Sequence, residues 1–183
     1  MIDEQIISFV KWNREQGCEA ELTYGALDDR VEPLPMPGVL TRRYGTLPEP
    51  LHTWIQQVNK LVAPQEQAWF LTEADYSEPY DDAVSDPDAA GFHWNEWERI
   101  SLDAALDDAE WQQQIRAFWD RYVPLVMIVQ PEYAFYAVDT HSSVGAVIYG
   151  REPEFEEYEE VAASFEEFLQ RIMNGTLKWY NLH

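Results

Sequence analysis

The sequence predicts a single α+β domain in which helices flank an antiparallel sheet. Its 183 residues fit one domain, and 46% of them are apolar, which is enough to build a core. Three strand-like runs follow one another through short connections, at Val123–Gln130, Glu132–Asp139 and Gly145–Gly150. Helical patterns come before and after these strands instead of alternating with them, so a repeated βαβ arrangement is not expected.

The first 46 residues predict a helix followed by an irregular segment, packed on a domain of residues 47–183. Ile2, Ile6, Ile7 and Val10 fit one face of a short helix. Prolines and glycines are frequent from residue 21 to residue 46, which predicts irregular structure or one short edge strand there.

A second helix is predicted to begin near Pro48 and to end before Pro64. Its apolar positions recur at intervals of three and four residues, at Leu51, Trp54, Ile55, Val58 and Val62. The next segment, Ala68–Thr72, has the composition of a strand.

The middle of the chain contains an acidic segment and then two aromatic segments. Seven acidic and no basic residues lie between Glu73 and Asp88, where two prolines predict a loop. Aromatics spaced by three at residues 92–102 fit either a helical turn or an irregular lid. Asp107 or Asp108 is expected to cap a helix whose apolar stripe continues to Tyr122, with Pro124 ending it.

The end of the chain predicts a hairpin, a glutamate-rich segment and a closing helix. The hairpin loop is residues 140–145, and eight acidic residues with no basic ones follow between Glu152 and Glu167. Ser164 and Glu167 have the spacing of a capping box, and Gly175 is a candidate for the end of the helix. The buried face of that helix is predicted to be Phe165, Phe168, Leu169 and Ile172.

The charge is the most unusual global property. Acidic residues number 34 and basic residues 12, for a net charge of −22. Such a surface repels nucleic acid and anionic membranes and attracts basic proteins or cations. General adaptation for solubility or high salt is the alternative explanation. No apolar run reaches about 18 residues and no basic segment precedes an apolar one at the start, so we expect a cytoplasmic protein.

Catalytic and metal-binding signatures are absent from the sequence. It contains no nucleophile elbow, zinc-protease motif, phosphate-binding loop or dinucleotide fingerprint. The four histidines are well separated, and an EF-hand loop begun at Asp86 would have Trp97 where a bidentate Glu is required. We therefore expect no catalytic residue, no cofactor and no metal.

The order of motifs from residue 92 to residue 175 resembles the SUKH superfamily, which includes bacterial immunity proteins and yeast cell-wall-assembly regulators. The motifs are WNEWERISL, FWDRYVPL, YAFYAVD, VIYG, EPEFEE and VAASFEEFL. Gln130, Pro131 and Glu132 replace the glycine-rich acidic turn that often precedes the central strand in this family. The resemblance implies an α+β protein-binding domain, and for many bacterial members the partner is a toxin, often a nuclease. A regulatory or scaffolding module without a toxin is the alternative.

The two acidic segments are the predicted binding surface for a basic toxin domain. Carboxylates steer a basic partner toward the surface, and aromatics among them can serve as anchors. Tyr76, Tyr80 and Tyr158 are candidates for exposed anchors, and the alternative for each is an ordinary loop tyrosine that covers the sheet. The candidate residues are Asp75, Tyr76, Glu78, Tyr80, Asp81, Asp82, Glu156, Glu157 and Tyr158.

Overall fold

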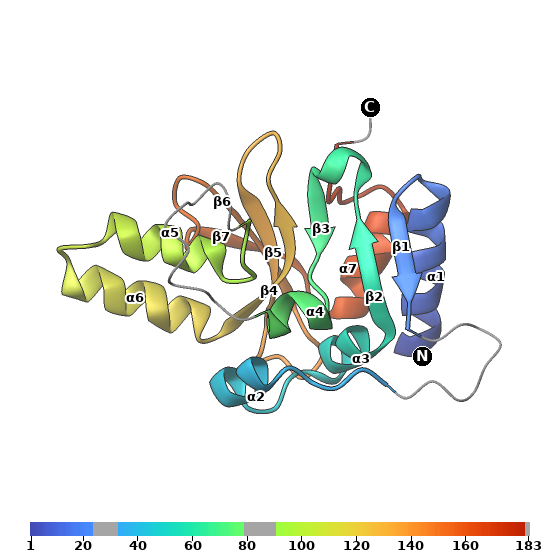
Figure 1. Cartoon of the computed structure of the whole chain (residues 1–183), viewed down its shortest axis with the longest axis horizontal. Coiled ribbons are helices and arrows are strands. Elements are labelled where there is room, and N and C mark those ends of the chain that lie inside the picture. Colours follow the sequence, from blue (N-terminus) through green and yellow to red (C-terminus); the bar gives the residue numbers. More distant parts are fainter. Residues whose placement is uncertain (24–32, 79–90, 182–183) are drawn as a thin grey trace.

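Seven strands form one antiparallel sheet in the order β1-β2-β3-β4-β5-β6-β7 in the computed structural model, which describes residues 1–23, 33–78 and 91–181 (Figure 1). Each strand pairs with the strands that come before and after it along the chain, so the whole sheet is a meander. The predicted α+β class is confirmed. The strands are β1 (Glu19–Leu22), β2 (Val58–Val62), β3 (Ala68–Phe70), β4 (Tyr122–Ile128), β5 (Ala134–Asp139), β6 (Val147–Arg151) and β7 (Tyr158–Ala162).

Helices occupy the connections at the two ends and in the middle of this meander. The described helices are α1 (Ile2–Glu15), α2 (Gly38–Tyr44), α3 (Glu49–Gln57), α4 (Glu73–Ser77), α5 (Glu96–Ala104), α6 (Ala109–Trp119) and α7 (Phe165–Met173), with a short 3-10 turn, η1 (Pro64–Glu66). The β1 strand of the N-terminal segment is paired with β2, so residues 1–22 contribute to the same sheet as the rest of the chain.

One face of the sheet is covered by α1, α3 and α7. Phe70 of β3 lies at its centre, with its ring centroid 4.9 Å from that of Trp54 in α3 and 5.5 Å from that of Phe9 in α1. Phe168 of α7 packs on Tyr136 of β5, at 4.9 Å between centroids. These buried aromatics form the part of the core that lies between the sheet and these three helices.

The opposite face is covered by α5 and α6, which project away from α1 and α7 in Figure 1. Trp119 at the end of α6 packs against Phe135 of β5, with 4.9 Å between the ring centroids. Trp97 of α5 stacks on Phe155, which lies between β6 and β7. The alternative left open for residues 92–102 is thus decided, because most of that segment is the helix α5.

A row of paired residues crosses this second face of the sheet. Trp69, Met127, Phe135, Gly150 and Tyr158 are register partners on β3 to β7. Directly paired residues of an antiparallel sheet share a face. Tyr158 is therefore the outermost member of a row whose inner members are packed under α5 and α6.

The helix predicted between Pro48 and Pro64 is only partly correct. It ends at Gln57, and Val58–Val62 is the strand β2, held between β1 and β3. In this strand Val58 and Leu61 are the fully buried residues and Val62 is half-buried, and β-branched residues favour the strand. Pairing on both sides decided the outcome.

Four other elements differ from the sequence predictions. Residues 38–44, expected to be irregular, form α2, and residues 73–77 of the predicted loop form α4. Pro124 lies inside β4 and does not end α6, which stops at Trp119. Residues 158–162 form a seventh strand that was not predicted.

The caps are largely as predicted. Asp108 accepts a hydrogen bond from the backbone N–H of Trp111 at the start of α6. Ser164 accepts one from Glu167 at the start of α7, while the Glu167 carboxylate accepts from the N–H of Ala163, one residue before the expected partner. Gly175 has a φ of 78°, as a residue ending a helix in the left-handed conformation does.

Candidate functional site

The nine predicted contact residues fall into two groups, one around α4 and one around the start of β7. Tyr80, Asp81 and Asp82 of the first group lie outside the described residues. The remaining six differ widely in exposure, and the differences separate residues that build the fold from residues that face solvent.

Tyr76 is buried, so its predicted role as an exposed anchor is wrong. Only 1% of it is exposed, its hydroxyl donates a hydrogen bond to the carbonyl oxygen of Pro124, and its ring contacts Trp94. Burial raises the pKa of this hydroxyl well above its usual value. The helix α4 turns Tyr76 inward, which a loop reading of this segment could not anticipate.

Asp75 caps the helix that carries Tyr76. Its carboxylate accepts hydrogen bonds from the backbone N–H and the hydroxyl of Thr72, at 2.8 and 2.9 Å, and Thr72 is the residue preceding α4. Burial raises the pKa of Asp75, although the two bonds from Thr72 oppose that effect. Among the three described residues of this group, only Glu78 is exposed.

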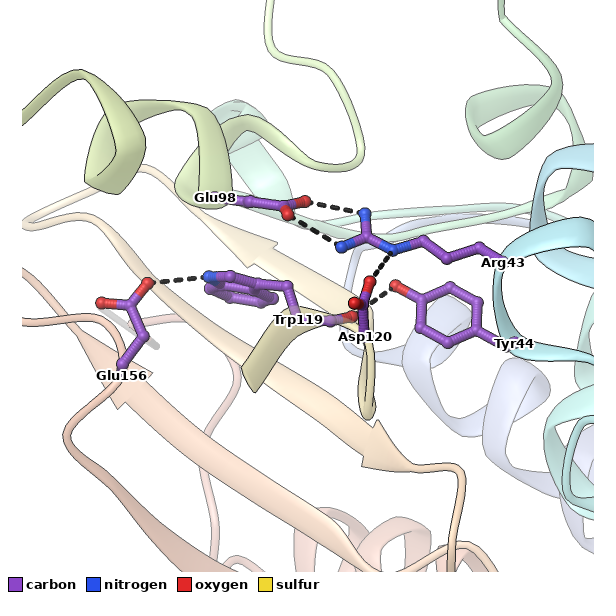
Figure 2. A network of polar contacts seen from close by, with 6 residues as sticks. All are labelled: Arg43, Tyr44, Glu98, Trp119, Asp120 and Glu156. Carbon is purple, nitrogen blue, oxygen red and sulfur yellow. Dashed lines mark hydrogen bonds and ion pairs between the residues drawn. The ribbon is translucent and has the colours of Figure 1, made fainter. Parts of the chain in front are cut away.

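Glu156 also has a structural partner. It is half-buried, and one carboxylate oxygen lies 2.7 Å from the indole nitrogen of Trp119, which is 1% exposed (Figure 2). The bond satisfies a buried donor that would otherwise be unpaired. Glu156 therefore fixes the turn before β7 to the end of α6.

The residues that follow Glu156 do face solvent. Glu157, Tyr158, Glu159 and Glu160 are all exposed, and we call these four the glutamate edge. Glu157 directly precedes β7, the last strand of the sheet, and the other three lie on it, so one side of their backbone has no neighbouring strand in the described part of the chain. The structure brings together Glu157 and Tyr158 of the predicted set, and adds Glu159 and Glu160.

Glu159 and Glu160 belong to the acidic segment predicted as a binding surface, but they were not among the nine candidate residues because β7 was not predicted. The signal was present: Tyr158 and Val161 are strand-forming residues, and they follow β6 after a connection short enough for a further turn of the meander. The four glutamates around them, which are poor strand formers, outweighed that signal.

Tyr158 is an oriented aromatic on this edge. It is 48% exposed, its ring packs on Phe118 and Tyr122, and its hydroxyl lies 3.2 Å from the Tyr122 hydroxyl. Burial, followed by this hydrogen bond, raises the pKa of Tyr122, so its hydroxyl stays protonated near neutral pH. The ring is thus held on one side and open to solvent on the other.

A network of hydrogen bonds connects α2, α5 and α6 with the turn that precedes the glutamate edge (Figure 2). Arg43 of α2 donates two hydrogen bonds to the Glu98 carboxylate of α5, at 2.7 and 2.8 Å, and a third to Asp120 at 3.0 Å. The hydroxyl of Tyr44 donates to the carbonyl oxygen of Trp119 at 2.9 Å. Since Trp119 in turn holds Glu156, α2, α5, α6 and the turn before β7 are linked by consecutive contacts.

The described residues contain no group of three His, Cys, Asp or Glu side chains placed to hold a metal ion. Within residues 1–23, 33–78 and 91–181, none of the helices is both long enough and apolar enough to cross a membrane.

Comparisons with known proteins found no similar protein. No protein-family model matches the chain, and the searches of curated proteins and of solved structures gave no match. The resemblance to the SUKH superfamily therefore stays a prediction from the sequence. The exposed residues of the glutamate edge are the basis for inferring a function.

Proposed function

We propose that this chain is a protein-binding domain of SUKH type that neutralises a bacterial toxin by binding it directly, and that the glutamate edge is its contact surface. The observation that carries the proposal is the run of exposed carboxylates at Glu157, Glu159 and Glu160 along the last strand of the sheet, next in sequence to the half-exposed ring of Tyr158.

The charge of the edge suits a basic partner. None of the three glutamates forms an ion pair within the described residues, so their charges are available to a partner. The net charge of −22 extends the attraction beyond contact distance at low ionic strength. A nuclease that binds nucleic acid through Lys and Arg side chains presents the complementary surface, and covering that surface blocks its active site.

Tyr158 can contribute binding energy that exposed charges alone do not supply. Interface energy is concentrated in a few desolvated aromatic or Arg anchors, whereas exposed charge pairs contribute little each. The exposed face of the Tyr158 ring can receive an Arg or Lys side chain by a cation–π contact, with Glu160 on the same face of the sheet. Packing on Phe118 and Tyr122 limits the rotamer freedom that would be lost on binding.

The test uses a basic toxin domain encoded next to this gene, mixed with the purified chain at low and at high salt. We expect a stoichiometric complex that abolishes the toxin's activity and weakens as salt rises, because exposed charges are screened. Neutralising Glu157, Glu159 and Glu160 to Gln should weaken binding about tenfold at low salt. The matched control removes exposed charges elsewhere, with Glu15→Gln, Glu110→Gln and Asp103→Asn, and should bind as the natural chain does.

Two results would contradict the proposal. One is a toxin domain that keeps its full activity in the presence of excess chain. The other is an equal loss of affinity for the edge variant and the control variant, which would make net charge the only determinant. A regulatory or scaffolding role without a toxin would account better for the first result, and the second would reject the glutamate edge as the contact surface.

A further inference from the structure

In the described part of the chain, the outer side of β7 has no strand beside it. The strand pairs with β6 through Tyr158, Glu159, Glu160 and Ala162, and no other described strand pairs with it. The carbonyl oxygen of Val161 is taken by the guanidinium of Arg171, 3.0 Å away on α7. The open part of the edge is therefore Tyr158–Glu160, the strand portion of the glutamate edge.

Side chains on this open part alternate between the two faces of the sheet. Tyr158 and Glu160 are register partners of Gly150 and Ile148, on the face covered by α5 and α6. Glu159 pairs with Tyr149 and lies on the other face. A strand added outside β7 would meet an acidic side chain above and below the sheet.

The charge decides which kind of strand can be added. A second copy of this chain, paired through its own β7, would set Glu159 and Glu160 against the glutamates of the first copy, and like charges directly opposite are destabilising. An extended segment with Lys or Arg at successive or alternate positions would instead form opposite-charge pairs across the new ladder. The aromatic ring at the edge also favours a cation.

We propose that the open edge of β7 binds an extended basic segment of its partner as an eighth strand of the sheet. This inference deepens the proposed function, on which it rests, by naming the form of the partner at the contact: an extended chain whose backbone pairs with β7. Backbone bonds then supply affinity, and the glutamates select the charge.

A protective role is the alternative explanation for charged edge residues, since such residues prevent sheets from joining edge to edge. The two explanations make different predictions about the backbone amide groups of a ligand. Charge attraction without strand addition depends on the number of positive charges in a ligand and not on its amide groups. Strand addition needs free N–H groups at alternate residues of the ligand, because only alternate residues of a strand bond to one neighbour.

The experiment uses the peptide Lys-Thr-Lys-Thr-Lys-Thr, blocked at both ends, and two isomers methylated on the backbone nitrogens of the odd or the even residues. All three carry the same charge. The full chain is titrated with each at low salt, and amide hydrogen exchange is followed at residues 158–162. We expect the parent and one isomer to bind and to slow exchange at β7, and the other isomer to bind at least about tenfold more weakly.

Equal binding of all three peptides, or no binding of the parent, would overturn strand addition. A variant carrying Glu159→Gln and Glu160→Gln should lose binding, and the control variant Glu15→Gln with Glu110→Gln should keep it. The outcome is separable from the toxin test. A toxin domain that is neutralised without any change of exchange at β7 would keep the proposed function and contradict this inference.

Discussion

Trp119 and Glu156 are joined by a hydrogen bond of 2.7 Å from the indole nitrogen to a carboxylate oxygen, at the junction between α6 and the turn before β7. Trp119 is buried against Phe135, and Glu156 directly precedes the glutamate edge. A residue chosen from the sequence as a contact for a partner is thus an internal support. The Glu156 carboxylate connects the turn that precedes the glutamate edge to the end of α6.

Replacing Glu156 by Ala should lower the free energy of unfolding by about 1–3 kcal/mol, because the buried indole N–H of Trp119 would lose its acceptor. Urea denaturation followed by tryptophan fluorescence measures the change. Glu157→Ala is the matched control: its neighbouring, exposed carboxylate accepts no described hydrogen bond, so a change within about 0.5 kcal/mol is expected. Equal stabilities of the two variants would show that the bond contributes nothing.

Gly150 is predicted to tolerate no side chain. A Cβ at this position would lie 2.6 Å from the ring of Phe135 and 2.6 Å from the carbonyl oxygen of Phe155. Gly150→Ala should therefore destabilise the protein by about 1–3 kcal/mol through overpacking. At Gly38 the nearest atom belongs to the flexible end of Arg42, so Gly38→Ala should leave the denaturation midpoint unchanged or raise it slightly. A reversed order of the two variants would refute the packing shown by the structure.

Arg43 should be more important as a bidentate donor than as a positive charge. Arg43→Lys keeps the charge but cannot form both bonds to Glu98, which is 9% exposed at its side chain. We expect a loss of about 1–3 kcal/mol in unfolding free energy, since a largely buried carboxylate would be left underbonded. Adding Glu98→Gln to Arg43→Lys should recover part of that loss. A double variant less stable than the single one would contradict the assignment.

The ion pair between Arg121 and Asp139 should make stability depend on acid pH. Partial burial raises the pKa of Asp139, but the hydrogen bonds from Arg121 and from the N–H of His141 outweigh burial and leave the pKa below its usual value. The folded state thus binds this proton more weakly than the unfolded state. The stabilisation is complete above the unfolded pKa of about 3.9 and is lost as pH falls through the lower folded value.

Asp139→Asn removes this contribution. The difference in unfolding free energy between the natural chain and Asp139→Asn should be largest near neutral pH and should shrink below about pH 4. Denaturation curves across that range measure it. Asp103→Asn, at an exposed position of α5, should show no such trend. A difference for Asp139→Asn that stays constant with pH would argue against the ion pair.

The fold class and most of the central elements could be predicted because their signals are local. The apolar run that forms β4 is buried along its whole length, and β5 and β6 are joined by a short loop that contains a glycine. The Ser164 cap and the apolar face of α7 are likewise encoded within a few residues. Such patterns are legible without knowledge of distant contacts.

The errors come from positions that distant partners decide. Val58–Val62 has a spacing that fits a helix or a strand, and pairing with β1, which is distant in sequence, and with β3 on the other side selects the strand. Tyr76 in an acidic stretch looks exposed until α4 directs it toward Pro124. Glu156 looks like its neighbours, and its role depends on Trp119, 37 residues earlier. Local composition identified the acidic surface but could not separate its supports from its exposed residues.

Whether the glutamate edge is the contact surface is tested by measuring the affinity of a toxin domain encoded next to this gene. It is measured for the natural chain and for the variant with Glu157, Glu159 and Glu160 changed to Gln. Calorimetry at low salt measures both dissociation constants, with the Glu15, Glu110 and Asp103 variant as the control. We expect the edge variant alone to bind about tenfold more weakly than the natural chain, and we expect this difference in affinity to decrease as salt screens the charges. Equal affinities for all three proteins would contradict it.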